Sequence, residues 1–186
     1  MASVIQPVKG GERLEAYLKK LAKKVSNPGT LRVGFLENAT YPDGTPVATV
    51  AAIQNFGAPN ADIPKRPFFS KMVNEKSPEW GGKLAKILEL QDWDGKRSLE
   101  LMGEGIAGQL RQSIVDTLEP HLSPVTIVLR KMRADNPDLV VTKSVVREAA
   151  RMVRGLDHPV AADVVSDKPL IDTGHLLASV DKEVTR

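Results

Sequence analysis

The sequence of 186 residues contains no cysteine, which excludes a disulfide framework, a thiolate zinc site and a cysteine nucleophile. It has only eight aromatic residues, about 4% of the chain, which is few for a surface that stacks on single-stranded bases. No apolar run approaches the ~20 residues that cross a membrane. The first residues also lack the charged and apolar regions of a secretory signal. We therefore expect one domain over 1–186, made and kept in a cytoplasm, with no membrane partner.

Neither sign of charge predominates, because 26 basic and 23 acidic residues leave a net charge of only +3. The charges alternate in blocks, with net values of +5 over 1–36, −3 over 37–64, +4 over 65–86, −4 over 87–120, +4 over 121–155 and −3 over 156–186. This pattern does not predict the single basic face typical of nucleic-acid binding. Two interpretations stay open. The blocks are solvated faces, or a positive surface meets a negative surface on another copy of the chain.

Apolar spacing predicts an α+β fold. Recurrence at three and four residues predicts helices over 12–25, 47–56, 79–90, 97–118 and 142–154, and Ser123 followed by Pro124 predicts the start of another. Alternation predicts strands over 30–36 and 179–185. We expect a small antiparallel sheet packed by several helices, one of them long. The long helix has an apolar stripe of Leu99, Met102, Ile106, Leu110, Ile114 and Leu118.

Three glycines in that helix, Gly103, Gly105 and Gly108, match the dinucleotide-binding spacing G-x-G-x-x-G. In a dinucleotide site the glycines occupy a turn from strand to helix, whereas these interrupt a continuous helical stripe. Each costs a helix about 1 kcal/mol relative to alanine. Close approach of another helix or subunit would offset that cost, so we expect Gly105→Leu to hinder packing.

The tripeptide Asp172, Thr173, Gly174 matches the active-site sequence of aspartic proteases. That chemistry needs two carboxylates that share a proton, and the chain has no second tripeptide. The alternative is structural: Asp172 or Thr173 caps a short helical turn over 175–177.

Other chemistry-bearing residues form no recognisable motif. His121, His158 and His175 lack metal-ligand spacing, and no serine has the glycine-flanked turn of a hydrolase nucleophile. We therefore expect no catalytic, cofactor or metal site. The basic clusters at 65–66 and 130–133 could contact phosphate; the alternatives are solvated surface and a subunit contact.

Four segments together resemble a known family. They are V-A-A-I-Q-N-F-G at 50–57, I-P-K-R-P-F at 63–68, L-S-P-V-T at 122–126 and K-P-L-I-D-T-G-H-L-L-A-S-V at 168–180, with the long helix between the second and third. In this order they resemble the tail-completion, or neck, proteins of tailed bacteriophages, a group also described as virion morphogenesis or tail-component proteins. The resemblance covers about 30–133 and 167–180. Residues 134–166 depart from it, and we interpret them as a helical insertion before the C-terminal strand.

This resemblance implies a non-enzymatic virion protein that forms a closed ring, commonly hexameric, and joins or completes the tail. The alternatives are a tail terminator or minor tail component, and a DNA-binding module of the virion. The implied partners are copies of itself, connector, tail-terminator or tail-tube proteins, and non-specific DNA in the lumen. The implied location is the neck or tail of the virion, after assembly in the host cytoplasm.

Candidate residues for subunit contact or loop anchoring come from the resembling segments and the long helix. They are Ile63, Pro64, Arg66, Pro67 and Phe68; Gly103, Gly105 and Gly108; and Leu170, Asp172, Thr173, Gly174, Leu176 and Ser179. We expect Arg66→Glu to weaken assembly without unfolding the chain.

Overall fold

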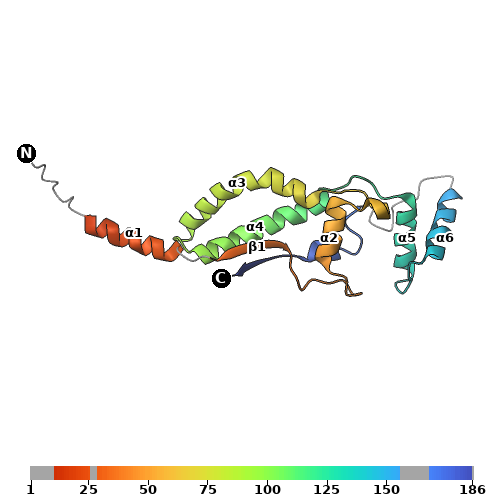
Figure 1. Ribbon diagram of the computed structural model, residues 1–186, viewed down its shortest axis with the longest axis horizontal. Coiled ribbons are helices and arrows are strands. Elements are labelled where there is room, and N and C mark those ends of the chain that lie inside the picture. The colour runs from red at the N-terminus through yellow and green to blue at the C-terminus, as the bar shows by residue number, and fades with distance from the viewer. Residues whose placement is uncertain (1–10, 26–28, 156–167, 186) are drawn as a thin grey trace, which may run out of the picture.

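A computed structural model describes residues 11–25, 29–155 and 168–185, and within them the fold is α+β, as predicted. The molecule is elongated, with the sheet and two long helices in its middle (Figure 1). The helices are α1 (Gly11–Val25), α2 (Val47–Phe56), η1 (Pro59–Ala61), α3 (Phe68–Leu90), α4 (Gly95–Asp116), α5 (Pro124–Asp135), α6 (Lys143–Arg154) and α7 (His175–Ala178). The strands are β1 (Thr30–Phe35) and β2 (Val180–Thr185).

The sheet consists of β1 and β2, which run antiparallel with Thr30 opposite Thr185 and Phe35 opposite Val180. It therefore joins an early and a late segment of the chain. Both strands pack on α4, and Gly103 lies against both of them. A Cβ placed there would lie 2.8 Å from Leu31 Cδ1 and 2.9 Å from a side-chain carbon of Lys182, so glycine admits the sheet.

The other two glycines of the motif have no close neighbour in the described part of the chain. A Cβ at Gly105 or Gly108 would meet nothing within 4 Å there, so close approach of another subunit stays a prediction for them. The close neighbour of Gly103 is also the sheet rather than another helix, so the expected effect of Gly105→Leu on packing within the chain is not supported.

The core lies where α2, α3, α4 and the C-terminal segment meet the sheet. Its buried members are Val47, Ala51, Phe68, Met72, Ala107, Leu110, Ile114, Leu170, Leu176 and Val180. The predicted stripe of the long helix is buried at Met102, Ile106, Leu110 and Ile114. Leu118 is 48% exposed, because α4 ends at Asp116.

Helix α3 begins eleven residues before the predicted start at 79. Pro78 lies inside the helix, where its missing N–H removes one backbone hydrogen bond and bends the chain. Accordingly, α3 arches over α4 rather than following it as a straight rod (Figure 1). The helix continues on both sides of Pro78, so the predicted range 79–90 covers only its second half.

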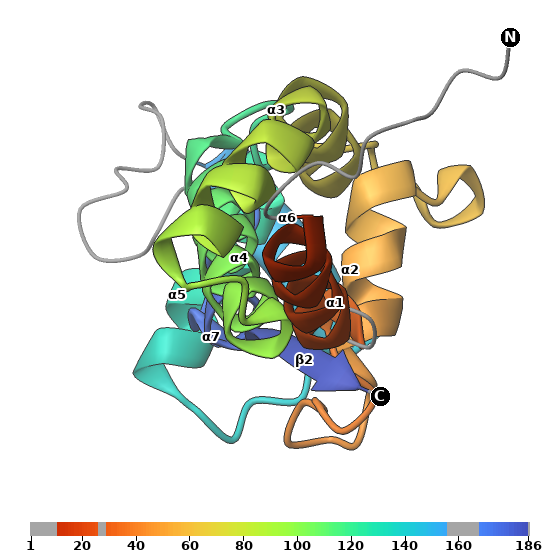
Figure 2. The same ribbon diagram turned by 90° about the vertical axis from the view of Figure 1, so that its left-hand side faces the viewer.

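The two ends of the molecule carry separate helices. At one end α5 and α6 pack together, and Ser123 caps α5 as predicted, with its Oγ accepting from Thr126 N–H at 3.1 Å. Helix α6 falls in the predicted insertion; residues 156–166 of that insertion lie outside the described residues. At the other end α1 projects beyond the α3–α4 pair (Figures 1 and 2).

Candidate functional site

The loop over residues 57–67 is closed on itself. Ala58 and Ile63 form an isolated antiparallel bridge, with Ala58 N–H donating to Ile63 O at 2.9 Å and Ile63 N–H donating to Ala58 O at 3.1 Å. Gly57 begins the loop with φ of 78°, and a Cβ there would lie 3.0 Å from Lys65 N. Glycine is therefore required at 57, because both the positive φ and the close backbone exclude a side chain.

Asn55 connects the end of α2 to the start of α3. Its side chain is 2% exposed, and its Oδ1 accepts from the N–H groups of Phe69 at 3.0 Å and Ser70 at 3.1 Å. Its Nδ2 donates to Ser70 Oγ at 2.7 Å. These N–H groups belong to the first turn of α3, which has no partner for them inside the helix. Asn55 thus acts as a helix cap supplied from another helix.

Arg66 is the buried cation of the loop, with 5% of its surface exposed. Its Nε donates to Pro120 O and one terminal nitrogen donates to Gln54 Oε1, both at 3.1 Å, while its own N–H donates to Gln54 O at 2.8 Å. Burial, with a smaller contribution from Arg130, lowers the pKa of Arg66. No carboxylate pairs with it in the described part of the chain. Arg66 holds three segments together, so the expectation that Arg66→Glu would spare the fold is not supported.

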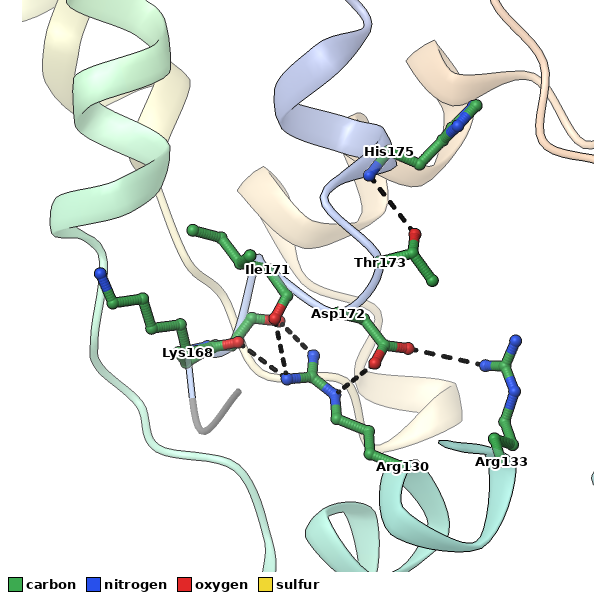
Figure 3. A network of polar contacts seen from close by, with 8 residues as sticks. Arg130, Arg133, Lys168, Ile171, Asp172, Thr173 and His175 are labelled. Carbon is green, nitrogen blue, oxygen red and sulfur yellow. Dashed lines mark hydrogen bonds and ion pairs between the residues drawn. The ribbon is translucent and has the colours of Figure 1, made fainter. Parts of the chain in front are cut away.

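Arg130 of α5 binds the C-terminal segment through its backbone (Figure 3). One terminal nitrogen donates to Lys168 O at 2.9 Å and Ile171 O at 3.2 Å, and the other donates to Pro169 O at 3.1 Å. Its Nε lies 3.4 Å from an oxygen of Asp172. One guanidinium therefore fixes four of the five residues from 168 to 172, and its planar fork of donors suits this task better than an ammonium group.

Asp172 also forms an ion pair with a second arginine. Arg133 lies 3.6 Å from its other carboxylate oxygen, and half of the Arg133 side chain is exposed (Figure 3). The carboxylate of the protease-like tripeptide thus lies between two guanidinium groups. This arrangement differs from the paired carboxylates that aspartic proteases need.

The N-cap of the turn that follows is Gly174 rather than Asp172 or Thr173, the two residues predicted for this role, although Thr173 accepts a hydrogen bond from the first residue of the turn. Thr173 Oγ1 accepts from His175 N–H at 3.3 Å, while Gly174 occupies the left-handed region with φ of 77°. His175 reaches Thr40 O with Nε2 at 3.0 Å, and its ring lies 4.6 Å from the ring of Tyr41. Ser179 Oγ donates to His175 O at 2.8 Å, so this serine closes the turn.

Helices α2 and α5, the segment 169–178 and the turn at 41–45 line an open hollow of about 720 Å³, and no residue of the loop 57–67 is in its wall. Its wall includes Tyr41, Gln54, Arg130, Asp172 and His175. Burial, followed by the charges of Asp172 and Asp43, raises the pKa of the Tyr41 hydroxyl. We define the anchored-loop site as residues 57–67 and 168–174 together with Arg130 and this hollow.

The structure brings most of the predicted candidates to this site, but not all of them. Phe68, Leu170 and Leu176 are core residues, of which Leu170 and Leu176 also line the hollow, and Ser179 lies just after α7. Gly103, Gly105 and Gly108 lie on α4, outside the site. The candidates at the site are Ile63, Pro64, Arg66, Pro67, Leu170, Asp172, Thr173, Gly174 and Leu176.

Sequence reasoning assigned no role to Asn55 or Gln54 and treated Arg130 only as part of a basic cluster. The one available signal for Asn55 was a pair of amides in an otherwise uncharged and largely apolar helix. Arg130 gave no such signal, because its partners are backbone carbonyls.

Within the described ranges, no group of three or more histidine, cysteine, aspartate or glutamate residues is arranged to hold a metal ion. No helix in those same ranges is both long enough and apolar enough to cross a membrane. Comparison of the chain with protein-family models, with curated proteins and with solved structures finds no match.

Proposed function

We propose that this chain is a non-enzymatic structural protein of the neck of a tailed bacteriophage, where it forms a closed ring and joins or completes the tail. The starting point is the resemblance carried by residues 50–57, 63–68, 122–126 and 168–180. A tail terminator or minor tail component is the alternative within the same class.

The observation that carries the proposal is the meeting of these segments in space. Arg66, from the second segment, binds Gln54 of the first and the carbonyl of Pro120, just before the third. Arg130, shortly after the third segment, binds the carbonyls of Lys168, Pro169 and Ile171 in the fourth. These bonds join segments that include parts of α2, α5 and the stretch before α7 into one hydrogen-bonded set. A subunit that must present a fixed surface to its neighbours needs this property.

The bonds at the site favour a scaffold over an enzyme. Asp172 pairs with two arginines, Ser179 closes a turn, and Ser113 Oγ donates to Phe68 O at 2.7 Å. Each of these groups already has a structural partner. Arg130 and Arg133 are likewise directed at Asp172, which gives no support to phosphate binding by that cluster.

Removal of the gene tests the proposal. We expect phage lacking the chain to yield filled heads beside finished but detached tails, with normal particles restored by the wild-type gene supplied in trans. Missing tails would favour the alternative of an earlier role in tail assembly. Normal infectious particles without the gene would refute both.

A matched variant separates a scaffold from a protease. Asp172→Asn keeps the size and oxygen acceptor of the side chain but removes its charge. We expect this variant to complement the deletion and to leave the sizes of all virion proteins unchanged. Loss of complementation together with an uncleaved virion protein would instead support proteolysis.

A further inference from the structure

Helix α1 carries an apolar face that no other described residue of the chain covers. Leu14, Tyr17 and Leu18 share one side of the helix, and each is more than half exposed. The helix also bears five basic and two acidic residues, for a net charge of +3. It is tied to the body at its C-terminal end, where Lys24 binds both the carboxylate and the carbonyl of Asp92. The rest of the helix projects away from the body (Figures 1 and 2).

Helix α2 presents a second uncovered face, which is itself uncharged. The helix contains no charged residue; Val47, Ala51 and Asn55 face inward, while Ile53 is 36% exposed and Phe56 is 68% exposed. The sequence that flanks it, 37–64, has no basic residue and a net charge of −3; Lys65 and Arg66 follow, and Arg66 is buried against Gln54. The three acidic side chains of 37–64, those of Glu37, Asp43 and Asp62, are all exposed.

We propose that α1 of one copy lies across the outer face of α2 in the next copy. This inference rests on the proposed function, because it assigns the surfaces that join neighbouring subunits of the ring. The apolar faces cover one another, and a helix with net charge +3 meets a block with net charge −3. Each face is uncovered, and the residues that flank the two faces carry opposite net charge. Each face is therefore a suitable partner for the other.

The arrangement of the fold makes this contact intermolecular. The sheet and the α3–α4 pair separate α1 from α2 along the length of the molecule (Figure 1). The two surfaces therefore lie at different places on each copy, and a contact from α1 of one copy to α2 of the next is head-to-tail. Such a contact closes into a ring when the rotation between copies allows it.

A second apolar surface competes for α1. It is a groove of about 390 Å³ between β1, α3 and α4, lined by residues that include Leu31, Trp80 and Leu84. Helix α3, which forms one wall of the groove, has four lysines and three glutamates, for a net charge of +1. The groove therefore offers no net acidic surface to the lysines of α1, so we assign α1 to α2 and use the groove as a control.

Cysteine cross-linking tests the contact directly, because the natural chain has no cysteine. Two proteins that differ in tag length, Leu18→Cys and Phe56→Cys, are mixed and oxidised. The control mixture pairs Leu18→Cys with Leu84→Cys. We expect the first mixture to give at least about tenfold more mixed dimer than the control, and the double variant Leu18→Cys/Phe56→Cys to give a ladder. Preferential cross-linking to Leu84→Cys would overturn the proposal.

A second experiment measures self-association by sedimentation, for the unmodified chain and for two variants with substitutions at exposed positions. Leu18→Asp and Phe56→Asp should each weaken self-association about tenfold or more in sedimentation, with unchanged circular dichroism and Tm because both side chains are exposed. Association that neither variant weakens would overturn the assignment of these helices while leaving a ring intact. A wild-type chain that stays monomeric at every concentration would also overturn it, and the gene-removal phenotype then decides the proposed function separately.

Discussion

Replacement of Arg130 by methionine is the sharpest test of how the anchored-loop site is held. The variant removes the hydrogen bonds to three carbonyls and the closer ion pair of Asp172, while it keeps a long apolar side chain. Hydrogen bonds from a charged group each contribute about 1.5–3 kcal/mol. The three share one guanidinium, so they are not additive, and we expect a loss of about 3 kcal/mol in the free energy of unfolding.

Thermal unfolding measures this loss. For a chain of this length each kcal/mol lowers Tm by about 2–4 °C, so Arg130→Met should lower Tm by about 6–12 °C. Arg130→Lys should recover less than half of the loss, because an ammonium group cannot serve all four partners at once. Hydrogen exchange should also quicken at the residues of α7 and at the start of β2, which follow the released segment.

Arg133→Met is the matched control. It removes the same charge next to the same carboxylate, but Arg133 is half exposed and lies 3.6 Å from Asp172. Exposed ion pairs contribute about 0–1 kcal/mol, so this variant should lower Tm by no more than about 4 °C. Equal shifts for the two variants would refute the importance of the carbonyl bonds.

The remaining predictions concern neighbouring contacts and are read by chemical denaturation. Asn55→Ala leaves two N–H groups of α3 without their acceptor and should cost about 2–4 kcal/mol, whereas Asn55→Asp keeps the acceptor and should cost less; equal costs would contradict the capping role. Arg66→Met should cost about 2–4 kcal/mol and Arg66→Glu more, because the carboxylate would face the carbonyl acceptors; wild-type stability of Arg66→Glu would contradict this. Gly103→Leu should cost about 1–3 kcal/mol through overpacking against the sheet, whereas Gly105→Leu should leave stability unchanged or raise it by up to about 1 kcal/mol; the reverse order would contradict the assigned packing.

Much of the fold follows from local patterns in the sequence. The bounds predicted for α2 are those observed, because its apolar residues end at Gly57, which the loop geometry requires. Ser123 before Pro124 likewise marks the start of α5. The first half of α3 could not be predicted in this way. Its cap is Asn55, thirteen residues before the helix begins, and the helix continues through Pro78.

The candidate site was predictable in its segments but not in its bonds. The sequence identified residues 63–68 and 168–180 as segments with a role. It could not reveal that Arg130 binds the carbonyls of residues about 40 positions later, because every residue offers the same carbonyl. The glycines of α4 show the same limit. Gly103 and Gly105 look alike in sequence, but only Gly103 lies against the sheet.

The contact between α1 and α2 could not be proposed from the sequence alone. The apolar stripe of α1 was visible there, and in most helices such a stripe faces the core of the same chain. Exposure of Leu14, Tyr17 and Leu18 makes it an uncovered surface. The proposed contact would also explain two of the alternating charge blocks, because the block of net charge +5 contains α1 and a block of net charge −3 contains α2.

The central claim is that copies of this chain form a ring at the junction of head and tail. Electron cryo-microscopy of the head–tail junction in tailed-phage particles assembled with this chain tests it most directly. We predict a closed ring of subunits with the fold described above, in which α1 of each copy lies on α2 of the next. A junction that contains no copy of this fold would contradict the account.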